Sequence, residues 1–173
     1  MIPIPLLRLA PWIIHCIHWA IAFGLYPTLP PRIPTHLDFG GAVTATRATS
    51  WGSWFGLPLV AVATSALLAG LSAYLPKKPS LFNFPDKERF LRLPPAAQAP
   101  VIVVMRATLD LTATGVALVM AMAHALLWYA ARGPVPAVAH AMLFVLTLLL
   151  GPAILLATSR VSAAVDAAAS STK

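Results

Sequence analysis

Hydrophobic residues fill four long segments of the chain, and polar residues collect in the intervals between them. The apolar segments cover residues 9–26, 54–75, 101–131 and 136–158. A helix that crosses a bilayer needs roughly 20 predominantly apolar residues, so each segment is suited to one crossing. The pattern predicts an all-α integral membrane protein, built as a bundle of four transmembrane helices.

The composition supports a membrane location. Of the 173 residues, 59% are hydrophobic and only 10% are charged, and the mean hydropathy is +0.81. A soluble globular domain carries about 25% charged residues, and a chain of this size cannot hide so much apolar surface in one core. The first segment follows Arg8 as a secretory signal would, but His15 and His18 fall in its apolar region and argue against cleavage. We therefore expect residues 9–26 to form a helix of the bundle.

The positive charges indicate an orientation. If the N-terminus is cytoplasmic, three cations face outward (Arg32, Arg47 and Arg132), Arg106 lies within the third segment, and the other eight of the 12 fall inside. Lys and Arg favour cytoplasmic loops, so we predict both termini inside and the loop after residue 26 outside. The net charge of +7 forms no stripe with interleaved aromatic residues, which argues against a nucleic-acid partner. The inside set comprises Arg8, Lys77, Lys78, Lys87, Arg89, Arg92, Arg160 and Lys173.

The segments that connect or follow the last three apolar segments also indicate local structure. The cytoplasmic loop reads "LPKKPSLFNFPDKERFLRLPPAAQ", where a short helix can start near Pro85 and must end before Pro94. Its aromatic residues and five cations suit a membrane interface with anionic headgroups, so this interfacial segment is either a connector or a docking site. The short "RGPVP" sequence makes the third and fourth helices antiparallel neighbours. Residues 161–173 are small and polar and are expected to form a flexible tail.

The third segment carries three polar residues on one stripe, Arg106, Asp110 and His124. An arginine and an aspartate four positions apart on a helix can pair, which lowers the cost of charge inside the membrane. The stripe is either a proton or ion path or a structural ion pair near the cytoplasmic interface.

Histidines form the second polar feature of the apolar segments. His15 and His18 lie one helical turn apart, and a neutral imidazole there can ligate haem or a (bacterio)chlorophyll, relay protons, or bond to a neighbouring helix. We expect His124 and His140 nearer the outer surface, so a bis-histidine haem is disfavoured. A zinc site from His36, His124 and His140 with Asp38 has no spacing signature. The residues therefore predict no metal and no cofactor.

The outer loop "YPTLPPRIPTHLDFGG" is the most unusual element. Four prolines fix φ and remove N–H donors, so we expect a stiff, polyproline-like strip, and "DFGG" then permits a sharp reversal. This stiffness would hold Arg32 as a cation, His36 as a switchable donor and Asp38 as an acceptor. With Gly41 and Trp51, these residues form the candidate site for a partner or ligand.

The same loop resembles a known family. "LPPRIPTHLDFGG" is similar to the signature of the bacterial membrane family called domain of unknown function 1648 (DUF1648), approximately L-P-x-x-I-P-x-H-F-x-x-x-G followed by W-G-S. "NFPDKERFLRLP" is similar to a second segment of the family. The likeness covers residues 1–131, which leaves residues 132–160 as a fourth helix and 161–173 as a tail. The matching positions are Leu29, Pro30, Ile33, Pro34, His36, Gly41, Trp51, Gly52 and Ser53, while Leu37 replaces the aromatic residue.

The resemblance implies a multi-pass protein of the bacterial cytoplasmic membrane and, in SdpI-like members, toxin immunity and signal reception. The chain shows no H-E-x-x-H, G-x-S-x-G or phosphate-loop motif, which argues against an enzyme. We expect a non-enzymatic protein that binds a partner through the outer loop, either as an accessory subunit of a membrane complex or homo-oligomer or as an SdpI-like sensor or immunity protein. The alternative is a cofactor-bearing or proton-conducting subunit that uses the intramembrane histidines and the Arg106–Asp110 stripe.

Overall fold

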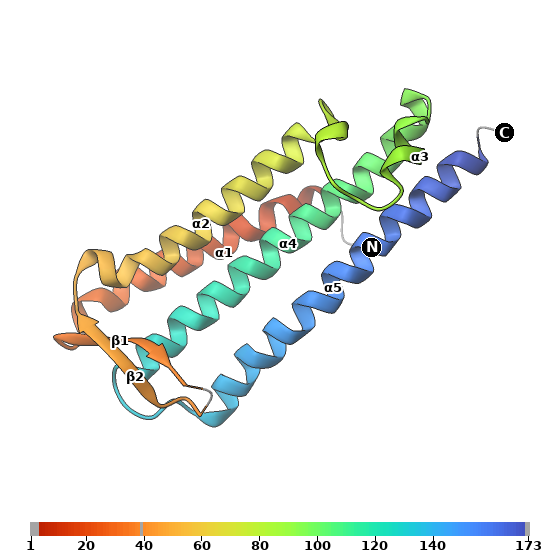
Figure 1. Ribbon diagram of the computed structural model, residues 1–173. Helices are drawn as coiled ribbons and strands as arrows, with labels where there is room; N and C mark the ends of the chain where they lie inside the picture. Colours follow the sequence, from red (N-terminus) through yellow and green to blue (C-terminus); the bar gives the residue numbers. More distant parts are fainter. Residues whose placement is uncertain (1–3, 39, 172–173) are drawn as a thin grey trace.

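The four long helices of the described chain lie side by side lengthwise (Figure 1). The computed structural model describes residues 4–38 and 40–171. All four helices are long and apolar enough to cross a membrane, which confirms the expectation of a helical, multi-pass membrane protein. α1 begins and α5 ends at the same end of the bundle, which we call the α3 end; the opposite end is the hairpin end. The helices are α1 (Ile4–Leu25), α2 (Trp51–Tyr74), α4 (Pro95–Ala130) and α5 (Ala137–Ser170).

α4 is the central helix of the bundle. α1, α2 and α5 all pack against it, and α5 packs chiefly against α4. Ala113 and Ala117 are buried on α4, and small residues of this kind let helix backbones approach closely in membranes. Gly115 faces Leu150 of α5, because a Cβ atom there would stand 2.2 Å from Leu150 Cδ1. A larger residue at position 115 would therefore push Leu150 aside.

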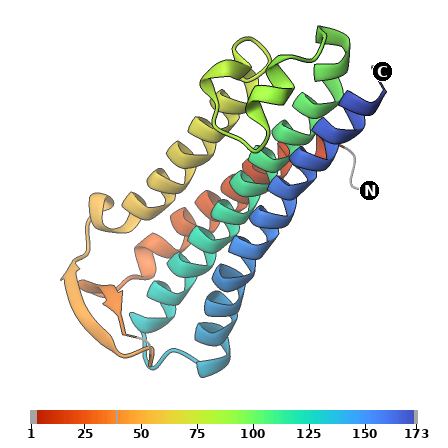
Figure 2. The ribbon, with the colours of Figure 1, turned by 45° about the vertical axis from the view of Figure 1, so that its right-hand side comes forward.

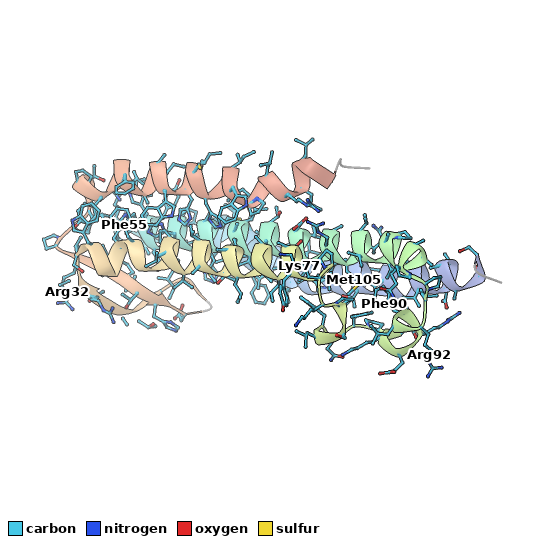
Figure 3. All side chains as sticks on the ribbon, turned by 90° about the horizontal axis from the view of Figure 1, so that it is seen from above. Arg32, Phe55, Lys77, Phe90, Arg92 and Met105 are labelled. Atoms are coloured by element: carbon cyan, nitrogen blue, oxygen red, sulfur yellow. The ribbon has the colours of Figure 1, made fainter. Side chains whose placement is uncertain are left out.

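α4 and α5 are longer than a bilayer requires. They contain 36 and 34 residues, or about 54 and 51 Å of helix, against roughly 30 Å of hydrocarbon. Their extra turns pack at the α3 end with α3 (Lys87–Leu91), and η2 (Pro79–Leu81) lies against α3. We call this assembly the α3 lobe; Phe90 and Met105 mark it beyond Lys77 (Figure 3). Its buried residues are Leu75, Phe90, Leu93, Val101, Met105, Val161, Val165 and Ala168.

The α3 lobe confirms one prediction and corrects another. The short helix expected between Pro85 and Pro94 is present as α3. The expectation of a flexible tail from residue 161 is wrong for residues 161–170, which continue α5. Alanine favours helix, and Val161 and Val165 are buried against the lobe. Two polar contacts also tie α3 to α5: the Ser162 hydroxyl donates to Asp86, and Arg89 pairs with Asp166.

A β-hairpin closes the other end of the bundle (Figure 2). After η1 (Tyr26–Thr28), β1 (Arg32–Leu37) pairs antiparallel with β2 (Val43–Ala48), with irregular register around His36. The expected polyproline-like strip is therefore wrong over β1, because β2 supplies a partner strand that the proline pattern did not reveal. The reversal is confirmed: the Ala42 N–H donates to Asp38 Oδ1 at 2.8 Å, and Gly41 has φ of +83°. Phe39 lies outside the described residues.

The hairpin is seated on the helices rather than hanging from them. Ile33 of β1 is 2% exposed and packs in a cluster with Ala22, Trp54 and Phe55. Thr49 donates its hydroxyl to the carbonyl of Pro30. Ser50 and Ser53 then form a reciprocal capping box at the start of α2, which satisfies backbone N–H groups that the first helical turn leaves open. The position of the hairpin is thus determined by contacts at both of its bases.

Candidate functional site

The buried polar residues of the bundle gather between α1, α2 and α4. On α1, Pro11, His15, His18 and Ala22 are all buried, and their spacing of three or four places them on one face. His15 is 3% and His18 5% exposed. Buried imidazoles require hydrogen-bond partners, and these partners come from two different helices.

His15 bonds to α2. Its Nε2 atom lies 2.8 Å from the hydroxyl oxygen of Ser65, which is fully buried. Ser65 shares a buried face of α2 with Ala61 and Ser72. The hydrogen bond therefore fixes α1 against α2 at this level.

His18 bonds to α4. Its Nε2 atom lies 2.8 Å from His124 Nδ1, and the two ring centroids are 5.0 Å apart. The expected difference in depth between these histidines is wrong, because His18 and His124 lie at the same level where α1 and α4 pack together. The interhelical hydrogen bonds proposed for His15 and His18 are confirmed.

Trp54 of α2 completes the surroundings of His124. The Trp54 ring centroid lies 3.9 Å from that of His124, and Trp54 Nε1–H donates to the carbonyl of Ala22 at 2.9 Å. Pro58 has no N–H, so the carbonyl of Trp54 four residues earlier lacks its usual helical donor. Proline inside α2 thus opens the backbone beside a buried imidazole.

Asp110 forms an ion pair with α1 rather than within α4. Its Oδ2 atom lies 3.4 Å from Arg8 Nε, so the expected Arg106–Asp110 pair is wrong. Arg8 reaches Asp110 because α1 begins at Ile4, several residues before the apolar segment. The Nε atom of Arg106 is buried and has no hydrogen-bond partner among the described residues.

His18 and His124 are not arranged as the two histidines that bind a haem iron from opposite sides. An ion held between two opposite imidazoles separates their nitrogens by roughly 4 Å, twice a typical metal–nitrogen bond, whereas these atoms are 2.8 Å apart. Each of His15, His18 and His124 keeps one buried ring nitrogen without a hydrogen bond among residues 4–38 and 40–171. These nitrogens are the atoms that can accept a ligand or exchange a proton.

The histidines at the hairpin end do not converge with His124. His36, Asp38 and His140 line a pocket of about 510 Å³ beneath the hairpin, while His124 is buried in the bundle. In the part of the chain that the structure describes, no three metal-ligating side chains come close enough to hold an ion.

The candidate loop residues mostly brace the hairpin. Arg32 donates to the Thr46 hydroxyl at 3.1 Å and to the Thr46 carbonyl at 3.3 Å; Thr46 lies opposite Pro34, which has no N–H to donate. Asp38 holds the turn, and Gly41 rests near His140 of α5. Arg32, His36 and Asp38 all stay exposed, as does Trp51 at 60%, while Gly41 is half-buried.

β2 is the part of this end that sequence reasoning missed. All six of its residues are exposed, and in the described chain no strand pairs with its outer edge. The alternation of Val43, Thr44, Ala45, Thr46 and Arg47 was a usable strand signal, since β-branched residues recur in it.

Comparison with known proteins adds no relative. No protein-family model, no curated protein and no solved structure matches the chain.

Proposed function

We propose that this chain is a non-enzymatic protein of the bacterial cytoplasmic membrane that binds a partner protein through its hairpin. In the proposed orientation, both termini are cytoplasmic and the hairpin is outside, as the distribution of Lys and Arg favours. The observation that carries the proposal is β2, whose six residues are all exposed while β1 rests on the bundle through buried Ile33 and Pro34.

An open strand edge is a binding surface because its N–H and C=O groups lack partners. An extended segment of another protein can add to it as a third strand, with backbone hydrogen bonds giving affinity and side chains giving specificity. The brace from Arg32 to Thr46 and the turn at Asp38 hold β2 in one shape. This preorganisation lowers the entropy lost on binding.

The partner determines which of two roles applies. A second membrane subunit bound at β2 would make this chain an accessory subunit of a complex. A secreted peptide or toxin bound there would make it a sensor or immunity protein, as the SdpI-like resemblance suggests. Both roles use the same edge, so one experiment addresses both.

A photocrosslinking amino acid at Arg47 tests the proposal in intact cells. Arg47 is exposed on β2, and Lys78, exposed in the loop at the opposite end, is the matched control. We expect irradiation to attach a partner polypeptide to the Arg47 position alone. Absence of any adduct at Arg47 and at Thr44, or the same adduct from Lys78, would contradict the proposal.

A second candidate function is proton transfer or cofactor binding along α1 and α4. Its support is the row formed by the Arg8–Asp110 pair, the His15–Ser65 bond and the His18–His124 bond, with one unbonded nitrogen on each histidine. Proton flux into liposomes that falls with Asp110→Asn and His124→Asn, or a visible absorbance band of the purified protein, would favour it. Colourless protein that conducts no protons in liposomes would exclude it.

A further inference from the structure

An apolar groove separates α1 from α4 near the hairpin end. Its volume is about 520 Å³, within the roughly 300–1,000 Å³ typical of small-molecule sites. His18, His124 and Trp128 also border it, but their unbonded nitrogens are buried, so the wall offers mainly hydrocarbon. The apolar wall includes Ile17, Ile21 and Leu25 of α1 and Leu118, Ala121 and Ala125 of α4.

The groove opens on the outer surface of the bundle. Ile17 and Ile21 are 56% and 54% exposed, and Leu118 and Tyr129 on the facing helix are 40% and 47% exposed. These residues belong to helices long and apolar enough to span a membrane. The molecules that reach the groove are therefore those dissolved in the bilayer.

Arg132 lies next to the hairpin end of the groove, against the lining residue Trp128. Its guanidinium carbon lies 4.1 Å from the centre of the Trp128 ring, and its Nη2 atom donates to the carbonyl of Thr28 at 3.1 Å and to the Thr28 hydroxyl. Thr28 follows α1, and Trp128 belongs to α4, so Arg132 bridges the two helices that form the groove.

Arg132 also has donors left over. A guanidinium has five N–H groups, and the contacts of Arg132 to Trp128 and Thr28 use only part of them. Of the carboxylates in the described chain, only Asp110 and Asp166 form ion pairs, with Arg8 and Arg89. The exposed Arg132 thus presents a cation with no counter-ion among the described residues, next to an apolar groove.

We propose that this groove binds one membrane lipid, with its hydrocarbon chain between α1 and α4 and its phosphate on Arg132. Arginine recognises phosphate through charge-assisted, often bidentate hydrogen bonds. The same chemistry is supplied by a phospholipid or by a polyprenyl phosphate. This site is separate from the partner surface on β2, and its occupancy is measurable without a partner.

Native mass spectrometry of the whole chain in mild detergent tests the proposal with defined lipids. Phosphatidylglycerol, polyprenyl phosphate and a diacylglycerol with matched chains are added separately. The diacylglycerol, which has no phosphate, tests whether binding needs the phosphate. Competition between phosphatidylglycerol and polyprenyl phosphate shows which of the two lipids the groove prefers. Arg132→Gln removes the cation. Ala125→Trp fills the groove from an exposed position, and Ala20→Trp, exposed on α1 but outside the groove lining, is the control.

We expect one phosphate lipid per chain, bound about tenfold more weakly after Arg132→Gln and displaced by Ala125→Trp but not by Ala20→Trp. A photoreactive group in the chain of the bound lipid should then label α1 or α4 near Ile21. Equal binding of diacylglycerol, or equal binding by all variants, would show only surrounding bilayer lipid and overturn the proposal. Absence of retained lipid on the wild-type chain would overturn it as well.

Discussion

Single polar residues fix α1 against α2 and α4. For each of these interactions, the sequence indicated the polar residue on one helix but not its partner on the other. The spacing of His15 and His18 was enough to predict one shared face. Their partners were not predictable, because the match between His18 and His124 depends on how far α4 is offset along α1. Arg8 shows the same limitation: the apolar segment begins after it, although the helix begins before it.

The bond between His18 and His124 predicts energetic coupling. We expect a double-mutant cycle of His18→Phe and His124→Phe to give roughly 0.6 kcal/mol, and up to about 1.7 kcal/mol, as for interhelical hydrogen bonds in membranes. Phenylalanine keeps ring volume, so the coupling reports the hydrogen bond. Thermal unfolding in detergent measures it. The cycle of His18→Phe with His140→Phe is the control and should be additive; additivity in both cycles would contradict the bond.

Asp110 provides a second residue-scale prediction. Because its carboxylate pairs with Arg8 across two helices, Asp110→Asn and Arg8→Gln should couple by about 1 kcal/mol, the upper end for a partly exposed ion pair. Asp110→Asn and Arg106→Gln should couple less, since these residues form no ion pair within the described chain. Unfolding of the three single and two double variants measures both couplings. A larger coupling with Arg106 would restore the pairing expected from their spacing.

At the scale of elements, the sequence predicted the helices, whose signals are local, and missed the segments whose structure depends on contacts with distant parts of the chain. The four helices and α3 follow from apolar length and from flanking prolines. β1 was not recognised, because its prolines match an unpaired strip as well as a strand that meets β2. The helical end of α5 was not predictable from its own residues, because Val161 and Val165 are covered by residues of the loop after α2 and of early α4.

The α3 lobe predicts a local effect of Phe90→Ala. Phe90 is fully buried in the lobe, and such a truncation costs about 3–5 kcal/mol. We expect amide hydrogen exchange to rise in α3, the first turns of α4 and residues 161–170, while the buried faces of α1 and α2 stay protected. Leu91→Ala, 37% exposed, is the control and should change little. Faster exchange throughout the bundle would mean that the lobe is not a separate stability unit.

At the scale of the whole molecule, the composition was sufficient to predict a membrane environment but not how the helices are arranged. A hydrophobic content of 59% indicates a bilayer without any knowledge of contacts. The central place of α4 depends on three interfaces and on a glycine facing Leu150, which no single segment displays.

The proposed orientation makes a labelling prediction. In a Cys16→Ser background, which removes the only cysteine, we expect a membrane-impermeant maleimide added to intact cells to label Arg47→Cys but not Lys87→Cys. Permeabilised cells should show both labelled, which controls for reactivity. Labelling of Lys87→Cys alone in intact cells would reverse the orientation and place β2 in the cytoplasm.

Partner binding at β2 is the central claim, and native mass spectrometry of the protein extracted from its own membrane tests it most directly. The account predicts an assembly heavier than one 18.3 kDa chain, which dissociates when Val43→Glu and Arg47→Glu change the outer strand. Lys77→Glu with Lys78→Glu, at the opposite end, should leave it intact. A bare monomer from the wild-type membrane would exclude the accessory-subunit role and leave the sensor or immunity role. An assembly unchanged by the β2 substitutions would contradict the account.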